Sequence, residues 1–370
     1  MTAKARADSK RPHRILSLDG GGVRGAMSIE ILAKIEEIAN KKGYETLADY
    51  FDYISGTSTG GIIATGLSLG WSVDKLRSFY ELHAEAMFDK AFLLKLFRYK
   101  YDDDNLRKIL KKEIGNISLG SSKLKTLLML VMRNATTDSP WPISNNPYAK
   151  YNDKKLEHQN TEIPLWQLVR ASTAAPTFFP PESVDLGDQT FIFVDGGITS
   201  YNNPAFQTFL MATSEPYRLN WQTGEKELLL VSVGTGSSPV ANADLVPGDM
   251  NLLYNASTIP AALMFAAANQ QDTLCRMFGK CLAGDMIDSE IGDMRADIDS
   301  LSGGPVKENL FTYMRYNAQL TDTGLAELGV GKLDAKQMQE MDNAKNLSGL
   351  QSIGRAVAKK RVKASHFADF

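Results

Sequence analysis

Ser58 has the surroundings of an exposed nucleophile. It is the middle residue of Gly56-Thr57-Ser58-Thr59-Gly60, a G-x-S-x-G pattern. The two outer glycines leave room for a tight turn that exposes the serine hydroxyl, and a helix that begins behind such a turn supports negative charge. The pentapeptide therefore predicts a nucleophile elbow in which Ser58 attacks an ester carbonyl.

A glycine-rich loop at residues 19–25 reads Asp-Gly-Gly-Gly-Val-Arg-Gly. Gly20, Gly22 and Gly25 fit the G-x-G-x-x-G fingerprint of a dinucleotide site. With that interpretation the chain is a nucleotide-binding regulatory protein. Asp19, however, stands at the mouth of the loop, where its charge would repel a phosphate.

The same loop also suits a developing oxyanion. Attack by Ser58 on an ester creates a negative oxygen, which preorganised backbone N–H groups stabilise by about 3 kcal/mol per donor. Gly20, Gly21 and Gly22 can supply such donors, because glycine lets the backbone approach a reacting carbon closely. The nearby G-x-S-x-G pattern favours this interpretation over the nucleotide site.

Asp195 is the candidate base. It ends an apolar run at residues 190–194 that predicts a strand, and two glycines follow it. A carboxylate with an ordinary pKa near 3.9 is a weak base for a serine, so a Ser58–Asp195 dyad must rely on desolvation and on the oxyanion hole.

A conventional triad is the alternative, because Ser58, Asp195 and His366 follow the chain order of α/β-hydrolases. The other three histidines have less suitable surroundings: a basic leader, a helical stretch and a polar segment. These are His13, His83 and His158.

Two strand-turn-helix units must position these residues. Residues 15–18 form an apolar run before the glycine loop, and apolar residues then recur at spacings of three and four over 27–38. Residues 50–54 predict a second strand, 55–61 a turn and 62–69 a helix. Consecutive units of this kind imply a parallel α/β sheet with its site at the carboxyl ends of the strands.

Apolar runs at residues 124–132 and 227–233 predict further buried strands of a mostly parallel sheet. Residues 137–147 are rich in Ser, Asn and Pro and predict a loop, whereas residues 259–268 predict an apolar helix too short to span a membrane. Residues 91–101 mix aromatic, apolar and cationic side chains, which suits either a lipid-facing element or a core helix.

The composition is that of a globular protein, with 43% hydrophobic residues and a net charge of −2 among 370 residues. This charge gives no global argument for binding a nucleic acid polymer. Basic clusters at both ends predict solvated tails, and Cys275 and Cys281 predict buried side chains in a reducing compartment. With no signal peptide and no window of 18 apolar residues, we expect a cytoplasmic protein that meets membranes from the surface.

Three motifs in order, at residues 19–25, 56–60 and 195–197, resemble the signature of the patatin-like phospholipase family. The stretches at 171–176, 233–236 and 313–315 resemble the family as well. The resemblance implies a three-layer α/β fold with a mostly parallel central sheet flanked by helices. It also implies a catalytic domain over residues 14–240, after a basic leader over 1–13, with residues 241–370 as a helical and mixed extension packing on it.

For the site, the resemblance implies Ser58 as nucleophile, Asp195 as base and Gly20 to Gly22 as the oxyanion loop. It implies Arg24 as an electrostatic helper near the substrate phosphate. Neither a metal nor another cofactor is implied.

The implied activity is hydrolysis of fatty-acyl esters in membrane phospholipids. Bacterial relatives of this size include antiphage effectors that a cyclic dinucleotide activates to degrade the inner membrane. We therefore expect a cyclic dinucleotide as activator and expect the enzyme to act at the inner membrane surface. Self-association into a homo-oligomer is a further expectation. A secreted or housekeeping esterase without nucleotide control is the alternative.

Overall fold

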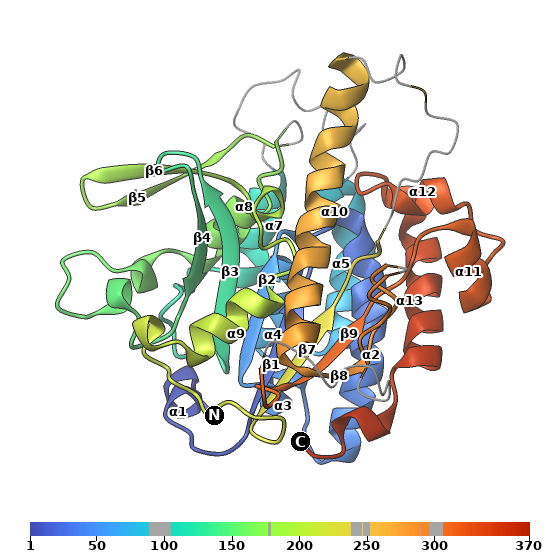
Figure 1. Cartoon of the computed structure of the whole chain (residues 1–370). Coiled ribbons are helices and arrows are strands. Elements are labelled where there is room, and N and C mark those ends of the chain that lie inside the picture. The colour runs from blue at the N-terminus through green and yellow to red at the C-terminus, as the bar shows by residue number, and fades with distance from the viewer. Residues whose placement is uncertain (89–104, 177–178, 238–245, 247–251, 289, 296–305) are drawn as a thin grey trace.

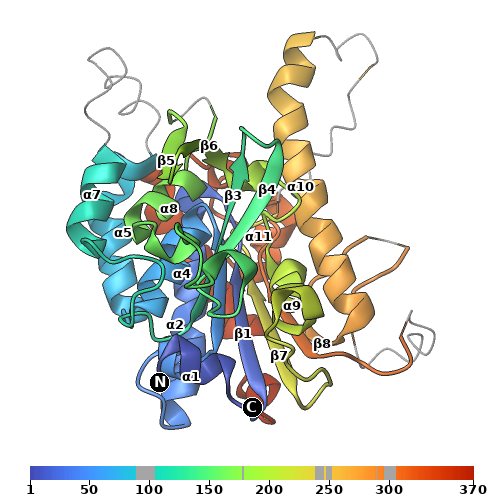
Figure 2. The ribbon, with the colours of Figure 1, turned by 90° about the vertical axis from the view of Figure 1, so that its left-hand side faces the viewer.

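A central β-sheet lies between two layers of helices (Figures 1 and 2). The computed structural model describes residues 1–88, 105–176, 179–237, 246, 252–288, 290–295 and 306–370. Within these residues the sheet has nine strands, in the order β5-β6-β3-β2-β1-β7-β9-β8, and β4 pairs with β3 outside this path. The strands are β1 (His13–Leu18), β2 (Tyr53–Thr57), β3 (Leu127–Asn134), β4 (Ser139–Ser144), β5 (Glu182–Leu186), β6 (Gln189–Asp195), β7 (Leu228–Val233), β8 (Lys280–Ala283) and β9 (Thr312–Tyr316).

The predicted α/β class and the mostly parallel sheet are confirmed, because β1, β2, β3, β7, β8 and β9 run parallel to their neighbours in this group. The helices are α1 (Ala3–Ala7), α2 (Gly25–Lys41), α3 (Leu47–Tyr50), α4 (Thr59–Ser68), α5 (Val73–Phe88), α7 (Asn105–Ile114), α8 (Leu165–Ser172), α9 (Ala205–Thr213), α10 (Leu252–Phe278), α11 (Asp322–Leu328), α12 (Ala335–Gln339) and α13 (Leu347–Arg361). Figure 2 shows α2, α4 and α5 on one side of the sheet and α9 and α10 on the other.

Each face of the sheet has its own apolar core. In β1, Leu16 and Leu18 belong to the core beneath α2, α4 and α13, whereas Ile15 belongs to the core beneath α9 and α10. This division follows from strand geometry, since successive side chains point to opposite faces. The buried apolar runs of the sequence are therefore strands covered on both faces.

The second strand-turn-helix unit is tighter than predicted. The strand expected over residues 50–54 begins only at Tyr53, because residues 47–50 form α3, whose first turn is closed by a capping box between Thr46 and Asp49. β2 then runs to Thr57 and α4 begins at the next residue but one. The predicted turn over residues 55–61 is thus reduced to Ser58 alone.

The loop predicted over residues 137–147 was wrong, because β4 lies within it and forms an antiparallel hairpin with β3. Pro140 and Pro142 lack the N–H of a ladder donor, which is tolerated in an edge strand, and β3 is the one partner of β4 among the described strands. Trp141 packs against Phe193 with ring centroids 5.1 Å apart. This tertiary contact outweighs the loop-like composition.

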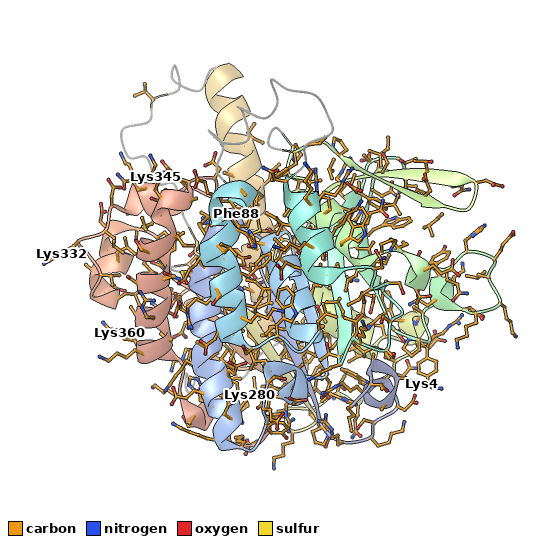
Figure 3. The ribbon with its side chains drawn as sticks, turned by 180° about the vertical axis from the view of Figure 1, so that it is seen from behind. Lys4, Phe88, Lys280, Lys332, Lys345 and Lys360 are labelled. Atoms are coloured by element: carbon orange, nitrogen blue, oxygen red, sulfur yellow. The ribbon has the colours of Figure 1, made fainter. Side chains whose placement is uncertain are left out.

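The solvated tails predicted at both ends were wrong as tails, although most of the lysines in the two basic clusters are exposed to solvent. In the first 13 residues, Arg6 has only 2% of its surface exposed, and its Nη1 lies 2.7 Å from Oδ1 of Asp52. The basic cluster near the carboxyl end belongs to α13, which packs on α2. Figure 3 shows Lys332, Lys345 and Lys360 on the outer side of α11 to α13.

Residues after 240 complete the sheet as well as covering it, since β9 pairs with β7 and β8 pairs with β9. α10 contains the helix predicted over residues 259–268 but is longer, and its first half extends beyond the sheet (Figure 1). No helix in the described ranges is both long and apolar enough to cross a bilayer. The aromatic and cationic segment at 91–101 lies outside the described residues.

Candidate active site

Two strand ends meet beside β3 and bring Ser58 and Asp195 together. β3 has two hydrogen-bonding edges, and because β4 occupies one of them, β2 and β6 share the other. β2 ends with Thr57 opposite Val131, and β6 ends with Asp195 opposite Met132. Since β6 runs antiparallel to β3, the two strands approach head to head and their terminal side chains become neighbours.

The expected proximity of Ser58 and Asp195 therefore has a different cause from the one the sequence suggested. We predicted that parallel strands would present both residues at one edge of the sheet. β6 is instead an antiparallel strand that continues the line of β2 beyond its end. The small residue Gly196 permits the meeting, because a Cβ there would lie 2.3 Å from the carbonyl oxygen of Val131.

Ser58 has the strained backbone of a nucleophile elbow, with φ of 53° and ψ of −121° at the start of α4. The glycines around it are required by close backbone contacts. A Cβ on Gly56 would lie 2.1 Å from the carbonyl oxygen of Gly60, and a Cβ on Gly60 would lie 2.3 Å from that of Leu18. The G-x-S-x-G pattern is thus a steric requirement of the strand-to-helix turn.

Ser172 holds the backbone of the elbow. The Ser58 amide N–H donates to Oγ of Ser172 at 2.9 Å, and that hydroxyl donates to the carbonyl oxygen of Val131 at 2.6 Å. The fully buried Ser172 side chain thereby links the turn to β3. Ser58 needs this partner because its backbone lies outside any ladder at this point.

The Ser58 hydroxyl donates directly to Asp195, with Oγ 2.7 Å from Oδ2. The other carboxylate oxygen accepts the amide N–H of Gly197 at 2.6 Å. Burial raises the pKa of Asp195 from 3.8 to about 6, although the bonds from Ser58 and Gly197 oppose the rise. Asp195 is therefore a stronger base than an exposed carboxylate, as a serine–aspartate pair requires.

The contacts of His366 do not support the alternative Ser58–Asp195–His366 triad. Both oxygens of Asp195 are occupied by Ser58 and Gly197, and His366 pairs through Nδ1 with the hydroxyl of Tyr316 at 2.8 Å. The structure thus places the carboxylate directly on the serine. Among the described residues, no group of three or more His, Cys, Asp or Glu side chains is arranged to hold a metal ion.

The glycine loop lies directly against the elbow, since a Cβ on Gly20 would be 3.4 Å from Cβ of Ser58. The expected donors are not equivalent. The Gly20 N–H is already bonded to the carbonyl oxygen of Asn202 at 3.0 Å, so it is not available to an oxyanion. The N–H groups of Gly21 and Gly22 have no partner in the described part of the chain.

Asp19 is not the exposed anion that we expected at the mouth of the loop. It is buried, and Arg315 from β9 donates to both of its carboxylate oxygens, at 2.8 and 2.5 Å. Arg315 also donates to the hydroxyl of Ser232 at 2.7 Å. The charge of Asp19 is thus compensated within the protein.

Arg24 is buried at the wall of a cavity of about 180 Å³, and its Nε donates to the carbonyl oxygen of Gly21 at 3.4 Å. Burial lowers the pKa of Arg24 to about 10, with Asp19 opposing, so Arg24 is a cation at neutral pH. The cavity has polar walls that include Arg24 and Thr235 and an apolar wall of α10 that includes Met264 and Phe265. Such walls suit a molecule with polar and apolar parts.

Three residues that hold the site were not among the predicted site residues: Ser172, Thr235 and Arg315. Each stands in a stretch that resembled the patatin-like family, but nothing in those stretches predicted which atoms they would contact. The identity of a partner 114 residues away from Ser58, as Ser172 is, depends on how the strands assemble.

Comparison with known proteins identifies the family of this chain. A family model described as patatin-like phospholipase matches residues 16–209. An intracellular phospholipase A2 of Caenorhabditis elegans is 30% identical over 255 residues, covering 67% of this chain and 22% of that protein. A cGAMP-activated phospholipase of Vibrio cholerae is 35% identical over 215 residues, covering 53% of this chain and 57% of that protein. Patatin-like protein 1 of Arabidopsis thaliana is 28% identical over 363 residues, covering 85% of this chain and 84% of that protein.

Proposed function

The chain belongs to the patatin-like phospholipase family, and from this membership we propose that it hydrolyses fatty-acyl esters of membrane phospholipids with a Ser58–Asp195 dyad. The observation that carries the proposal is the direct bond of 2.7 Å between Oγ of Ser58 and Oδ2 of Asp195. The chain spans 22% of the length of the Caenorhabditis elegans relative and 57% of the length of the Vibrio cholerae relative. Family membership therefore does not by itself give this chain the whole activity of either protein.

The mechanism follows from these contacts. Asp195 accepts the hydroxyl proton as Oγ of Ser58 bonds to the ester carbonyl carbon. The carbonyl oxygen becomes an oxyanion, which the N–H groups of Gly21 and Gly22 stabilise together with that of Thr59 at the start of α4. The proton then passes to the departing alcohol oxygen, leaving an acyl-enzyme. Water attacks the acyl carbon, its proton goes to Asp195, and the fatty acid leaves as Ser58 recovers the proton.

The cavity beside the glycine loop is the proposed site for the polar part of the lipid. Arg24 supplies a buried positive charge there, which attracts the substrate phosphate in a medium of low dielectric constant. We propose that the protein works from the cytoplasmic side, at the inner membrane surface. Its recovery from the periplasm or the medium in fractionated cells would contradict that location.

The test of hydrolysis is fatty-acid release from vesicles of phosphatidylethanolamine and phosphatidylglycerol. Each protein is assayed with and without cGAMP. We expect release by the wild type in at least one of the two conditions, and a fall of at least about 10³-fold in Ser58→Ala and in Asp195→Asn under that condition. Ser348→Ala, at an exposed serine of α13, is the matched control and keeps full activity. Release by Ser58→Ala equal to that of the wild type would overturn the dyad.

We propose further that a cyclic dinucleotide activates the enzyme, so that it degrades the cell's inner membrane in antiphage defence. The name of the Vibrio cholerae relative, a cGAMP-activated phospholipase, supports this part of the proposal. The test repeats the vesicle assay with cGAMP and with other cyclic dinucleotides. Release that needs one nucleotide supports the switch, whereas equal release without any nucleotide leaves an esterase without nucleotide control.

A further inference from the structure

The side chain of Thr235 lies against the glycine loop. Thr235 follows β7 in Gly234-Thr235-Gly236, has 3% of its surface exposed, and donates through Oγ1 to the carbonyl oxygen of Gly20 at 2.7 Å. A Cβ on Gly21 would lie only 2.2 Å from the same hydroxyl oxygen. The hydroxyl therefore touches the peptide unit that joins Gly20 to Gly21.

That peptide unit decides where one oxyanion donor points. The Gly20 carbonyl and the Gly21 N–H belong to one planar trans group, so they point in opposite directions. A bond that fixes the carbonyl also fixes the N–H. We propose that Thr235 is a positioning residue of the active site, whose hydroxyl aims the Gly21 N–H at the oxyanion; the inference rests on the proposed hydrolysis.

The neighbouring peptide units are held in other ways. The carbonyl of Gly21 accepts the backbone N–H of Arg24 at 3.2 Å, and the N–H of Val23 donates to the carbonyl of Met341 at 2.9 Å. These two bonds are made by the backbone and survive side-chain substitution, although the Gly21 carbonyl also accepts Nε of Arg24 at 3.4 Å. At the unit between Gly20 and Gly21, by contrast, the carbonyl is held by a side-chain hydroxyl.

Loss of that bond has a specific chemical consequence. Glycine tolerates either orientation of a peptide plane, so the unit is free to rotate once its carbonyl is released. A rotated unit would present the carbonyl of Gly20, a negative dipole, where the Gly21 N–H had been. The transition state would be weakened, while binding of the uncharged ester would change little.

The experiment compares Thr235→Val, which keeps the shape and removes the hydroxyl, with Thr235→Ser, which keeps the hydroxyl. Thr126→Val is the matched control, because Thr126 is buried too and its hydroxyl donates to Ser68 at 2.8 Å before β3 begins, away from the loop. Each protein is assayed for kcat and KM on a soluble fatty-acyl ester, and for inhibition by a trifluoromethyl ketone, which forms an oxyanion adduct with a serine.

We expect Thr235→Val to lower kcat by about 10- to 100-fold and to leave KM within about threefold of the wild type. This loss is smaller than the loss of about 10²- to 10³-fold that follows removal of an oxyanion donor itself. The inhibition constant of the ketone should rise by a similar factor. Thr235→Ser should restore kcat to within about threefold of the wild type, and Thr126→Val should leave it unchanged.

Two results would overturn the inference. One is a Thr235→Val enzyme with unchanged kcat and ketone inhibition. The other is an equal loss in Thr235→Ser and Thr235→Val, which would indicate packing and not the hydroxyl. Failure of the proposed function looks different, because a wild type that neither hydrolyses esters nor reacts with a fluorophosphonate at Ser58 fails before any variant is compared.

Discussion

The guanidinium of Arg315 holds the carboxylate of Asp19 through two hydrogen bonds, although 296 residues separate them in the chain. Asp19 directly follows β1, and Arg315 lies in β9, with β7 between the two strands. Both side chains are buried. The ion pair thereby ties the start of the glycine loop to a strand from the last fifth of the chain.

Arg315→Met should therefore destabilise the protein strongly, because it leaves the charge of Asp19 buried without a partner. We expect a loss of about 3 to 5 kcal/mol in the free energy of unfolding, measured by urea denaturation. The double variant Asp19→Asn/Arg315→Met should recover part of this loss, since no unpaired charge remains. Losses that simply add would contradict a direct interaction between the two side chains.

The pH dependence of hydrolysis should follow Asp195. Burial raises its pKa to about 6, and only the deprotonated carboxylate can accept the proton of Ser58. The value of kcat/KM should thus fall about tenfold per pH unit below about 6 and level off above it. A profile from pH 4 to 9 on a soluble ester checks this. A midpoint near 4 would mean that Asp195 is not desolvated in the free enzyme.

Asp195→Asn should make the protein more stable at neutral pH. The folded-state pKa of about 6 lies above the ordinary 3.8, so the wild type loses stability as the pH rises through this range, and the amide does not. We expect a gain on the order of 2 to 3 kcal/mol at pH 8, disappearing below about pH 4. Denaturation at both pH values tests this, and an equal gain at the two would argue against ionisation as the cause.

Two adjacent glycines of α4 should respond differently to alanine. A Cβ on Gly60 would lie 2.3 Å from the backbone oxygen of Leu18. The nearest neighbours of a Cβ on Gly61 would be two side-chain atoms, of Leu130 and Ser172, each at 3.3 Å, and the nearest backbone atom would be 3.6 Å away. Backbone cannot yield as side chains do, so Gly60→Ala should abolish activity and lower the yield of folded protein. Gly61→Ala should fold and stay within about tenfold of wild-type kcat/KM, since alanine also favours a helix. Equal behaviour of the two variants would contradict the steric account.

The contrast between residues 56–60 and 137–147 shows where prediction from sequence succeeds. The elbow is a local structure, and its glycines are required within five residues, so the pattern alone identifies it. β4 depends on its pairing with β3 and on the contact of Trp141 with Phe193, neither of which a loop-like composition reveals. Gly20 shows the same limit, because its N–H donates to the carbonyl oxygen of Asn202, which lies 182 positions later in the chain.

The sequence by itself determined the two strand-turn-helix units, the glycine loop and the identity of the proposed nucleophile and base. These features depend on short-range sterics and on strand and helix periodicity, which involve residues that are close together in the chain. Only the tertiary structure decided that β6 runs antiparallel along the edge that β2 leaves free, and so sets Asp195 on Ser58. It likewise decided that Ser172, Thr235 and Arg315 hold the elbow and the loop. These contacts depend on strand order and register, which arise when distant apolar faces are buried together and are not encoded in any local pattern.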